Sequence, residues 1–344
     1  MARATNITNN SVPKRTVKKP KKTFKRRLFS AFLALGYIYI SSSLLIFKGP
    51  FQSLKDYAIE SIVSSHHPQL WLGLFSLNTV SNKEIQQYTN TAYGTTPVPT
   101  TPLDPTKLKD YKNITDNTIQ VEDYQGKTFS AKIMLIRDPK RVKVAVTSQM
   151  GKVGETVSEM VRENHAVAGI NGGSFQDVGW HGTGGNPQGT TIHNGQVIVQ
   201  GGDGNVIGIT RNGDLISGNY SIKKLQEFGV DEALSFDPIL VKDGVGMLQS
   251  SGGRGYAPRT AIGQKEDGTI IFIVTDGRMI HGPQNLGASL RDVQDLMLQY
   301  GAITAINLDG GSSSTMVYNG KLVNEPTDVL GERKVATAFI VMPE

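Results

Sequence analysis

An uncharged run of twenty residues near the N-terminus constrains this chain more than any other feature. The run is LFSAFLALGYIYISSSLLIF at 28–47, and as a helix it is long enough to cross about 30 Å of hydrocarbon. Residues 1–27 carry ten Lys and Arg and no acid. Because positive charge favours the cytoplasmic side, we predict a basic cytoplasmic tail (1–27), a single-pass transmembrane signal anchor (28–47) and an extracellular remainder.

A cleaved signal peptide is the alternative, with Ser41–Ser43 as the small residues near a cleavage site. The length of the basic region and the continuation of the apolar run past the serines favour the anchor. The chain has no cysteine, which is typical of a bacterial extracytoplasmic protein and not of a eukaryotic secreted one. After the tail, 26 basic residues face 30 acidic ones, a net charge of −4. This balance predicts that the folded part has no nucleic-acid partner.

The rest of the chain divides into a spacer and one domain. Residues 48–117 are predicted to form a helical stalk, from the apolar spacing within 50–88 and a capping Ser81, followed by a Thr/Pro linker at 89–107. From 118 to 344, short apolar runs alternate with Gly and Asp, which predicts an α+β fold: a β-rich, mixed-sheet domain with a few helices. The predicted strands are 131–136, 141–147, 166–170, 205–210, 269–275, 303–308 and 335–341, and the predicted helices are 154–164 and 287–300.

Polar, glycine-rich segments adjoin several of these strands: INGGSF at 170–175, APRTAIG at 257–263, TDGR at 275–278 and NLDGGSSST at 307–315. Alone, INGGSF and TDGR are typical of turns and Arg259 of a surface arginine, whereas NLDGGSSST could cradle a phosphate or a sugar. Together with Glu332 and Arg333 they collect carboxylates and arginines at strand ends. Carboxylates act at anomeric carbons, and arginines bind phosphate oxygens through two hydrogen bonds. A substrate that contains both a sugar and a phosphate would use both sets of side chains.

In this order and at this spacing, AVAGINGGSF, PRTAIG, TDGR, INLDGGSSSTMVYNG and ERKVATAFIV resemble the phosphodiester glycosidase family over about residues 118–344. The resemblance implies cleavage of a glycosyl-1-phosphodiester between the sugar and the phosphate. Bacterial relatives, often labelled exopolysaccharide biosynthesis proteins, frequently carry an N-terminal membrane segment like this one. We therefore expect an extracytoplasmic hydrolase of a sugar-phosphate polymer or glycoconjugate of the cell envelope, such as a teichoic acid or a phosphate-containing exopolysaccharide.

The predicted site follows from these segments. Its catalytic acids are Asp309, Glu332 and Asp276. Its substrate-binding residues are Asn171, Gly172, Gly173, Arg259, Arg278, Gly310, Gly311, Ser312, Ser313, Arg333 and His181.

We expect Arg259 and Arg278 to hold the phosphate, and Asp309 or Glu332 to act at the anomeric centre or its water. Asp276 is expected to orient an arginine or a sugar hydroxyl, and Asn171 to bind the sugar. His281, like His181, is a second candidate to line the cleft.

Three alternatives stay open at this point. No cofactor is predicted, although Asp309, Asp276 and Asn171 are oxygen ligands of the kind that suits Ca²⁺ or Mg²⁺. A non-catalytic polysaccharide-binding or assembly factor would have the same fold. A phosphodiesterase would break the P–O bond and not the C–O bond.

Overall fold

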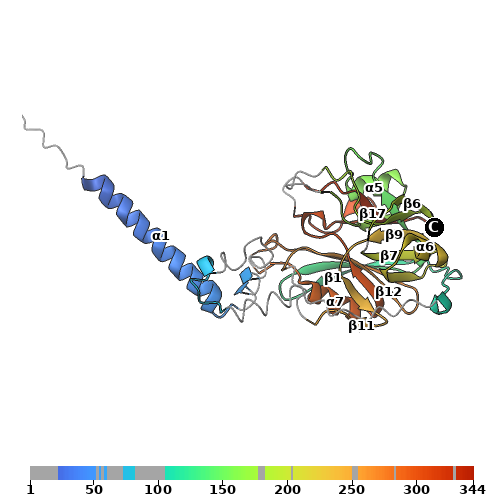
Figure 1. Ribbon diagram of the computed structural model, residues 1–344, viewed down its shortest axis with the longest axis horizontal. Coiled ribbons are helices and arrows are strands. Elements are labelled where there is room, and N and C mark those ends of the chain that lie inside the picture. The colour runs from blue at the N-terminus through green and yellow to red at the C-terminus, as the bar shows by residue number, and fades with distance from the viewer. Residues whose placement is uncertain are drawn as a thin grey trace, which may run out of the picture.

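The computed structural model describes residues 22–51, 54–55, 58–59, 73–81, 105–176, 183–202, 204–249, 255–282, 284–327 and 331–344. The first element, α1 (Lys22–Lys48), projects away from the strand-rich part of the chain (Figure 1). Its segment Phe24–Lys48 is long and apolar enough to cross a membrane, and a signal sequence near the N-terminus would have the same properties. Most of the predicted stalk and linker lies outside the described residues.

Seven strands form the largest sheet, in the order β1-β2-β13-β12-β14-β10-β11. Its strands are β1 (Ile119–Gln125), β2 (Ser130–Ile136), β10 (Ile239–Lys242), β11 (Val245–Gly246), β12 (Thr260–Lys265), β13 (Ile270–Thr275) and β14 (Ala302–Asn307). The interior strand β13, between β2 and β12, has no solvent-exposed residue, which explains its nearly uninterrupted apolar sequence IIFIVT. Every strand pairing recorded in this sheet is antiparallel.

Two five-stranded antiparallel sheets complete the domain. We call the first the β4 sheet, with the order β16-β15-β4-β17-β3, and the second the β9 sheet, with the order β6-β5-β9-β7-β8. The β4 sheet contains β3 (Val142–Val146), β4 (Ala168–Asn171), β15 (Met316–Tyr318), β16 (Lys321–Leu322) and β17 (Thr337–Val341). The β9 sheet contains β5 (Thr191–His193), β6 (Gln196–Val199), β7 (Asn205–Thr210), β8 (Leu215–Asn219) and β9 (Val230–Ser235).

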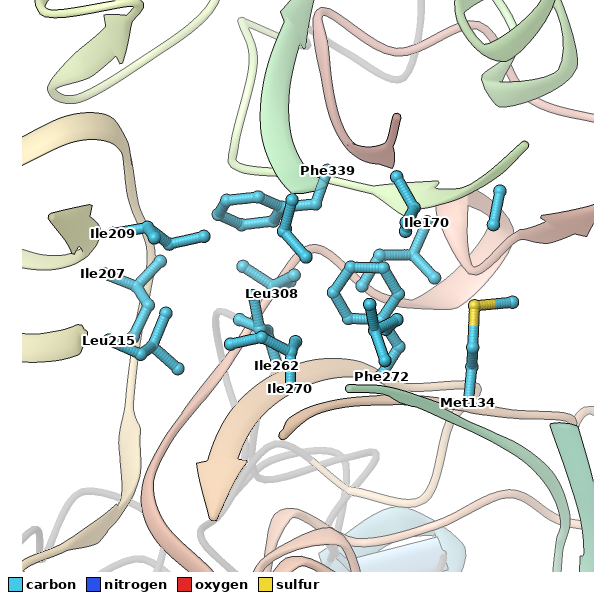
Figure 2. Close-up of a cluster of buried hydrophobic side chains, with 14 of the residues drawn as sticks. Met134, Ile170, Ile207, Ile209, Leu215, Ile262, Ile270, Phe272, Leu308 and Phe339 are labelled. Atoms are coloured by element: carbon cyan, nitrogen blue, oxygen red, sulfur yellow. The ribbon is translucent and has the colours of Figure 1, made fainter. Parts of the chain in front are cut away.

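The three sheets share one apolar core (Figure 2). Phe272 from the seven-stranded sheet, Ile170 and Phe339 from the β4 sheet and Ile207 from the β9 sheet are fully buried in it. Full burial of each such side chain stabilises the fold by about 1.5–3 kcal/mol. The core therefore holds the ends of strands from different sheets in fixed relative positions.

Short helices cover the sheets. They are α5 (Val157–Glu163), α6 (Ile222–Glu227) and α7 (Leu290–Gln299), with single 3₁₀ turns η1 (Pro105–Lys107), η2 (Pro139–Arg141) and η4 (Gly311–Ser313). Both α5 and α7 begin with a capping box, Thr156 with Glu159 and Ser289 with Asp292. In each box the side chains satisfy backbone N–H groups at the helix start, which explains where these helices begin.

The predicted α+β class, β-rich with few helices, is confirmed. Each predicted strand and both predicted helices coincide with an observed element to within a few residues. The other strands and α6 were not predicted. They are mostly short or carry mixed polar and apolar residues, such as Gln196–Val199.

Candidate active site

Strand ends gather at one edge of the seven-stranded sheet. The C-terminal residue of β13, Thr275, lies opposite Ala131 near the start of β2. At the start of β12, Ala261 lies opposite Asn307, the last residue of β14. Because neighbouring strands are antiparallel, the segments after β13 and β14 and the segment before β12 leave the sheet at the same edge. This edge therefore brings together three of the four polar segments noted in the sequence.

Asp276, the first residue after β13, lies in a cavity of about 440 Å³ at this edge. Its side chain is only 5% exposed, and its Oδ2 atom lies 3.1 Å from Nε2 of His281. Ser130 also donates a hydrogen bond to Oδ2, at 3.2 Å. The second oxygen, Oδ1, is buried and has no hydrogen-bond partner among the described residues. A buried carboxylate oxygen without a hydrogen bond lowers the stability of the fold. Its presence at the wall of a cavity is therefore typical of a functional group.

His281 connects this carboxylate to the cavity. The imidazole is 42% exposed, and its other nitrogen, Nδ1, lies 3.8 Å from Oε2 of Glu325. One nitrogen therefore faces a buried acid while the other stays open to a ligand and to a second, more exposed acid. A histidine oriented by a carboxylate in this way can accept or donate a proton at its free nitrogen. The remaining cavity residues are Asp123, Tyr124, Gln125, Ser130, Ala131, Lys132, Val323 and Asn324.

The loop between Asp276 and His281 has an unusual backbone. Arg278 and Met279 both adopt positive φ, at 55° and 64°. Left-handed conformations are costly for residues other than glycine and are frequent at functional sites. Arg278 is exposed, and its guanidinium lies beside Gly311 of the 309–315 segment: a Cβ added at Gly311 would lie 2.8 Å from Nη2. Gly311 itself has φ of +63°. Two segments that the sequence singled out, TDGR and LDGG, therefore meet through this pair.

Asn171, at the end of β4, is fully buried and joins three segments. Its Nδ2 donates to the carbonyl of Asp309 at 2.6 Å. Its Oδ1 accepts from the hydroxyl of Thr260 at 2.7 Å and from the N–H of Thr315 at 3.1 Å. This differs from the predicted contact with substrate, because the amide is enclosed by protein groups. The side chain positions the segment after β14 and does not face the cavity.

The two glycines after Asn171 are also part of the packing. A Cβ at Gly172 would lie 2.7 Å from both Leu234 and Thr337, so only glycine fits. The N–H of Gly173 donates to the hydroxyl of Thr337 at 3.0 Å. These contacts involve the two glycines that the sequence predicts to bind substrate. They bind β4 to β17 and to the β9 sheet instead.

Arg259 differs from its predicted role in the same way. It is 6% exposed, and its guanidinium donates to the carbonyl of Ala288, at 3.1 Å, and to that of Gly255. Its backbone packs under Gly310, where a Cβ would meet the carbonyl of Pro258 at 2.8 Å. The guanidinium therefore secures the loops at the sheet edge, and Arg278 is the more accessible of the two arginines.

Asp309 is half-buried, and its Oδ1 accepts a hydrogen bond from the N–H of Gly310 at 3.0 Å. Ser312 is half-buried as well, whereas Ser313 is fully buried and its hydroxyl lacks a described partner. Asn324 holds this segment against the cavity, because its Nδ2 donates to the carbonyl of Ser314 at 3.0 Å while the same residue lines the cavity.

Glu332 and Arg333 lie against other elements. Oε2 of Glu332 accepts the N–H of Ser158 at 3.0 Å, in the first turn of α5, where a carboxylate is favoured by the helix dipole. The guanidinium carbon of Arg333 lies 4.9 Å from the ring centroid of Phe175, a cation–π contact. Neither residue is among those that line the cavity. In the described contacts, Glu332 therefore caps α5 and Arg333 packs on Phe175.

His181 lies outside the described residues. Sequence reasoning missed Ser130, Lys132, Asn324 and Glu325, which reach the cavity from β2 and from the segment after β16. No local pattern marks them, and only strand pairing brings them to the site. His281 was a sequence candidate, and its pairing with Asp276 is the new observation.

The metal alternative does not fit the residues present. Within the described part of the chain, no group of three or more His, Cys, Asp or Glu side chains is arranged to hold an ion. Of the three ligands named for Ca²⁺ or Mg²⁺, Asn171 already uses its oxygen twice in internal hydrogen bonds.

Comparison with known proteins gives the family context. The family model for phosphodiester glycosidases matches residues 164–342. A Bacillus subtilis protein, the SPβ prophage-derived protein YomE, is 39% identical over 87 residues, which is 25% of this chain and 13% of that protein. Mouse N-acetylglucosamine-1-phosphodiester α-N-acetylglucosaminidase is 37% identical over 70 residues, 20% of this chain and again 13% of the relative. The matched segments are thus a small part of these curated relatives.

A solved structure has the same fold. The catalytic domain of the zebrafish N-acetylglucosamine-1-phosphodiester α-N-acetylglucosaminidase superposes with a TM-score of 0.56 at 21% identity, covering 69% of this chain and 88% of that one. This likeness supports the β-rich architecture described above.

Proposed function

The chain belongs to the phosphodiester glycosidase family, and on that premise we propose that it hydrolyses a glycosyl-1-phosphodiester at the cavity beside Asp276 and His281. The observation that carries the proposal is the buried, half-unpaired carboxylate of Asp276 held 3.1 Å from an accessible histidine. A buried carboxylate that orients an accessible histidine at a cavity is an arrangement that proton-transfer sites use.

The charges around the cavity match the two halves of such a substrate. Asp123, Asp276 and Glu325 make the cavity acidic, with Lys132 as its basic residue besides His281. Carboxylates accept hydrogen bonds from sugar hydroxyls and stabilise the positive charge that develops on the sugar ring. We place the sugar there. The phosphate then lies toward Arg278, whose exposed guanidinium sits beside Gly311 in the adjacent loop.

In the reaction we propose, water attacks the anomeric carbon while the C–O bond to the phosphate breaks. The phosphate leaves without a strong acid because its conjugate acid has a low pKa. The free nitrogen of His281 takes the proton of the attacking water, and Asp276 stabilises the imidazolium that forms. Arg278 balances the charge of the departing phosphate. In this proposal Asp309 and Glu332 take no part in the proton transfer. Asp309 belongs to the loop that adjoins Arg278, and Glu332 caps α5.

For the location, we propose that α1 is retained as a signal anchor, with the tail in the cytoplasm and the domain outside a bacterial cell. The domains we propose keep the predicted boundaries, with a catalytic unit at 118–344. An anchored domain outside the membrane meets phosphate-containing envelope polymers where they are made, so we propose a polymer or glycoconjugate of this class as the substrate.

The test is turnover of sugar-1-phosphodiesters by the full chain in lipid vesicles, run in ¹⁸O-labelled water and followed by mass spectrometry. We expect free sugar that carries the label, because water adds to the anomeric carbon. Label in the phosphate product would instead identify a phosphodiesterase. Polymer binding with no released sugar would identify a non-catalytic binding or assembly factor.

A further inference from the structure

A short segment beyond the anchor, residues 73–81, packs against the C-terminal half of α1 (Figure 1). Ser43 of α1 is buried and donates a hydrogen bond to the carbonyl of Phe75 at 2.6 Å. One turn earlier on the same helix, the hydroxyl of Tyr39 donates to the carbonyl of Leu74. The two hydroxyls therefore hold two successive carbonyls of the segment against the apolar span.

The carbonyls of Gly73 and Ser76, on either side of these two, accept hydrogen bonds from groups of the same segment. The carbonyl of Gly73 accepts the N–H of Asn78 at 3.0 Å. The carbonyl of Ser76 accepts both the N–H and the hydroxyl of Thr79, at 2.9 Å and 2.6 Å. Four consecutive carbonyls, 73 to 76, are thus paired inside the protein. Two of these four partners are side chains of α1, and irregular backbone in hydrocarbon needs such pairing by protein groups.

The outward side chains of the same turn are apolar. Leu74 is 53% exposed and Phe75 is 44% exposed. The inner side, in contrast, is buried, with Ser76 and Val80 in the segment and Phe47 on α1. An apolar outer face over the four paired carbonyls of residues 73–76 is a combination that suits contact with lipid acyl chains.

The position along α1 places this turn below the membrane surface. Lys48 ends the uncharged run, and an α-helix rises 1.5 Å per residue. Ser43 then lies about 8 Å, and Tyr39 about 13 Å, inside the level of Lys48. Since the hydrocarbon layer is about 30 Å thick, both hydroxyls lie within the half of the bilayer on the domain side.

From these observations we infer that residues 73–81 dip into the bilayer beside α1, with Leu74 and Phe75 among lipid acyl chains, so that the chain contacts the membrane through two elements. The inference rests on the proposed anchor. It also bears on processing, because cleavage near Ser41–Ser43 would remove the Tyr39 hydroxyl, and Ser43 with it if the cut falls after that residue. The paired turn therefore requires an uncleaved α1.

The native chain has no cysteine, so single spin labels test the inference directly. Labels are placed at Leu74→Cys and Phe75→Cys in the full chain reconstituted in phosphatidylcholine–phosphatidylglycerol vesicles. Their collision rates with oxygen, which concentrates in lipid, are compared with those of a water-soluble nickel chelate. Leu35→Cys on the exposed apolar face of α1 and Lys107→Cys on the exposed turn η1 serve as the lipid and water controls.

We expect the oxygen-to-nickel ratio at positions 74 and 75 to approach that of Leu35→Cys and to exceed that of Lys107→Cys severalfold. A ratio at 74 and 75 equal to that of Lys107→Cys, with Leu35→Cys in lipid, would overturn the inference and leave the anchor standing. If Leu35→Cys is also in water, the anchor itself is refuted. The two failures are therefore distinguishable.

Discussion

Replacing Asn171 by Ala tests the claim that this buried amide positions the segment after β14. The substitution removes three hydrogen bonds, to the carbonyl of Asp309, the hydroxyl of Thr260 and the N–H of Thr315. Each bond contributes about 1 kcal/mol net, so the free energy of unfolding should fall by about 3 kcal/mol. For a folded unit of this size, that corresponds to a fall in Tm of roughly 6–12 °C.

The assay combines calorimetry of the full chain in detergent with turnover of a sugar-1-phosphodiester well below the lowered Tm. We expect kcat/KM to fall by about tenfold or more, because a small displacement of groups beside the site weakens catalysis. Leu225→Ala in α6 is the matched control: the side chain is fully buried against the β9 sheet, and its loss costs about 2–5 kcal/mol. It should lower Tm similarly and leave kcat/KM unchanged at low temperature. An Asn171→Ala variant with native Tm and native activity would refute the reasoning.

Two further predictions concern the loop beside Arg278 and the half-buried side chain of Tyr300. Gly311→Ala should raise KM severalfold, because the new Cβ displaces the Arg278 guanidinium. Gly320→Ala is the control, since its backbone has a similar positive φ of +71° but a new Cβ there would meet open space. Equal KM values in the two variants would refute the role of Arg278. Burial, and then the hydrogen bond to Glu122, raises the pKa of Tyr300 from 10.0 to about 12. Between pH 10 and about 12 the folded state therefore keeps the Tyr300 proton that the unfolded state loses. The contribution of Tyr300 to the free energy of unfolding is thus complete below pH 10 and disappears as the pH rises through about 12. Denaturant titrations at several pH values should show that the free energy of unfolding falls less over this range in Tyr300→Phe than in the wild type. If the two free energies fall in parallel with pH, the role assigned to Tyr300 is contradicted.

The sequence predicted the strands that are buried on both faces, because they are continuous apolar runs. Ile270–Thr275 has no exposed residue and was predicted almost to its ends. Edge strands such as Gln196–Val199 carry half-exposed side chains and give no clear period. Apolar pattern fixes which side chains are buried, but the assignment of strands to three sheets depends on pairing between distant segments.

The same limit applies to the site. Asp276 and Arg278 were predicted because the TDGR segment after a buried strand is one of the motifs that carry the family resemblance. The enclosure of Asn171 was not, because its partners Thr260 and Thr315 are 89 and 144 residues away. Glu325 was missed for the same reason. It reaches the cavity only because the β15–β16 hairpin carries it there.

The central claim is that proton transfer takes place at Asp276 and His281 and not at Glu332. The most direct measurement is kcat for release of sugar from a sugar-1-phosphodiester by Asp276→Asn and by Glu332→Gln, both checked for native Tm. We predict that Asp276→Asn loses at least about a hundredfold, the usual contribution of general acid–base catalysis. Glu332→Gln should stay within about twofold, because its amide oxygen can still accept the N–H of Ser158. Native activity in Asp276→Asn, together with an inactive but folded Glu332→Gln, would contradict the account and move the active site to the N-terminal end of α5.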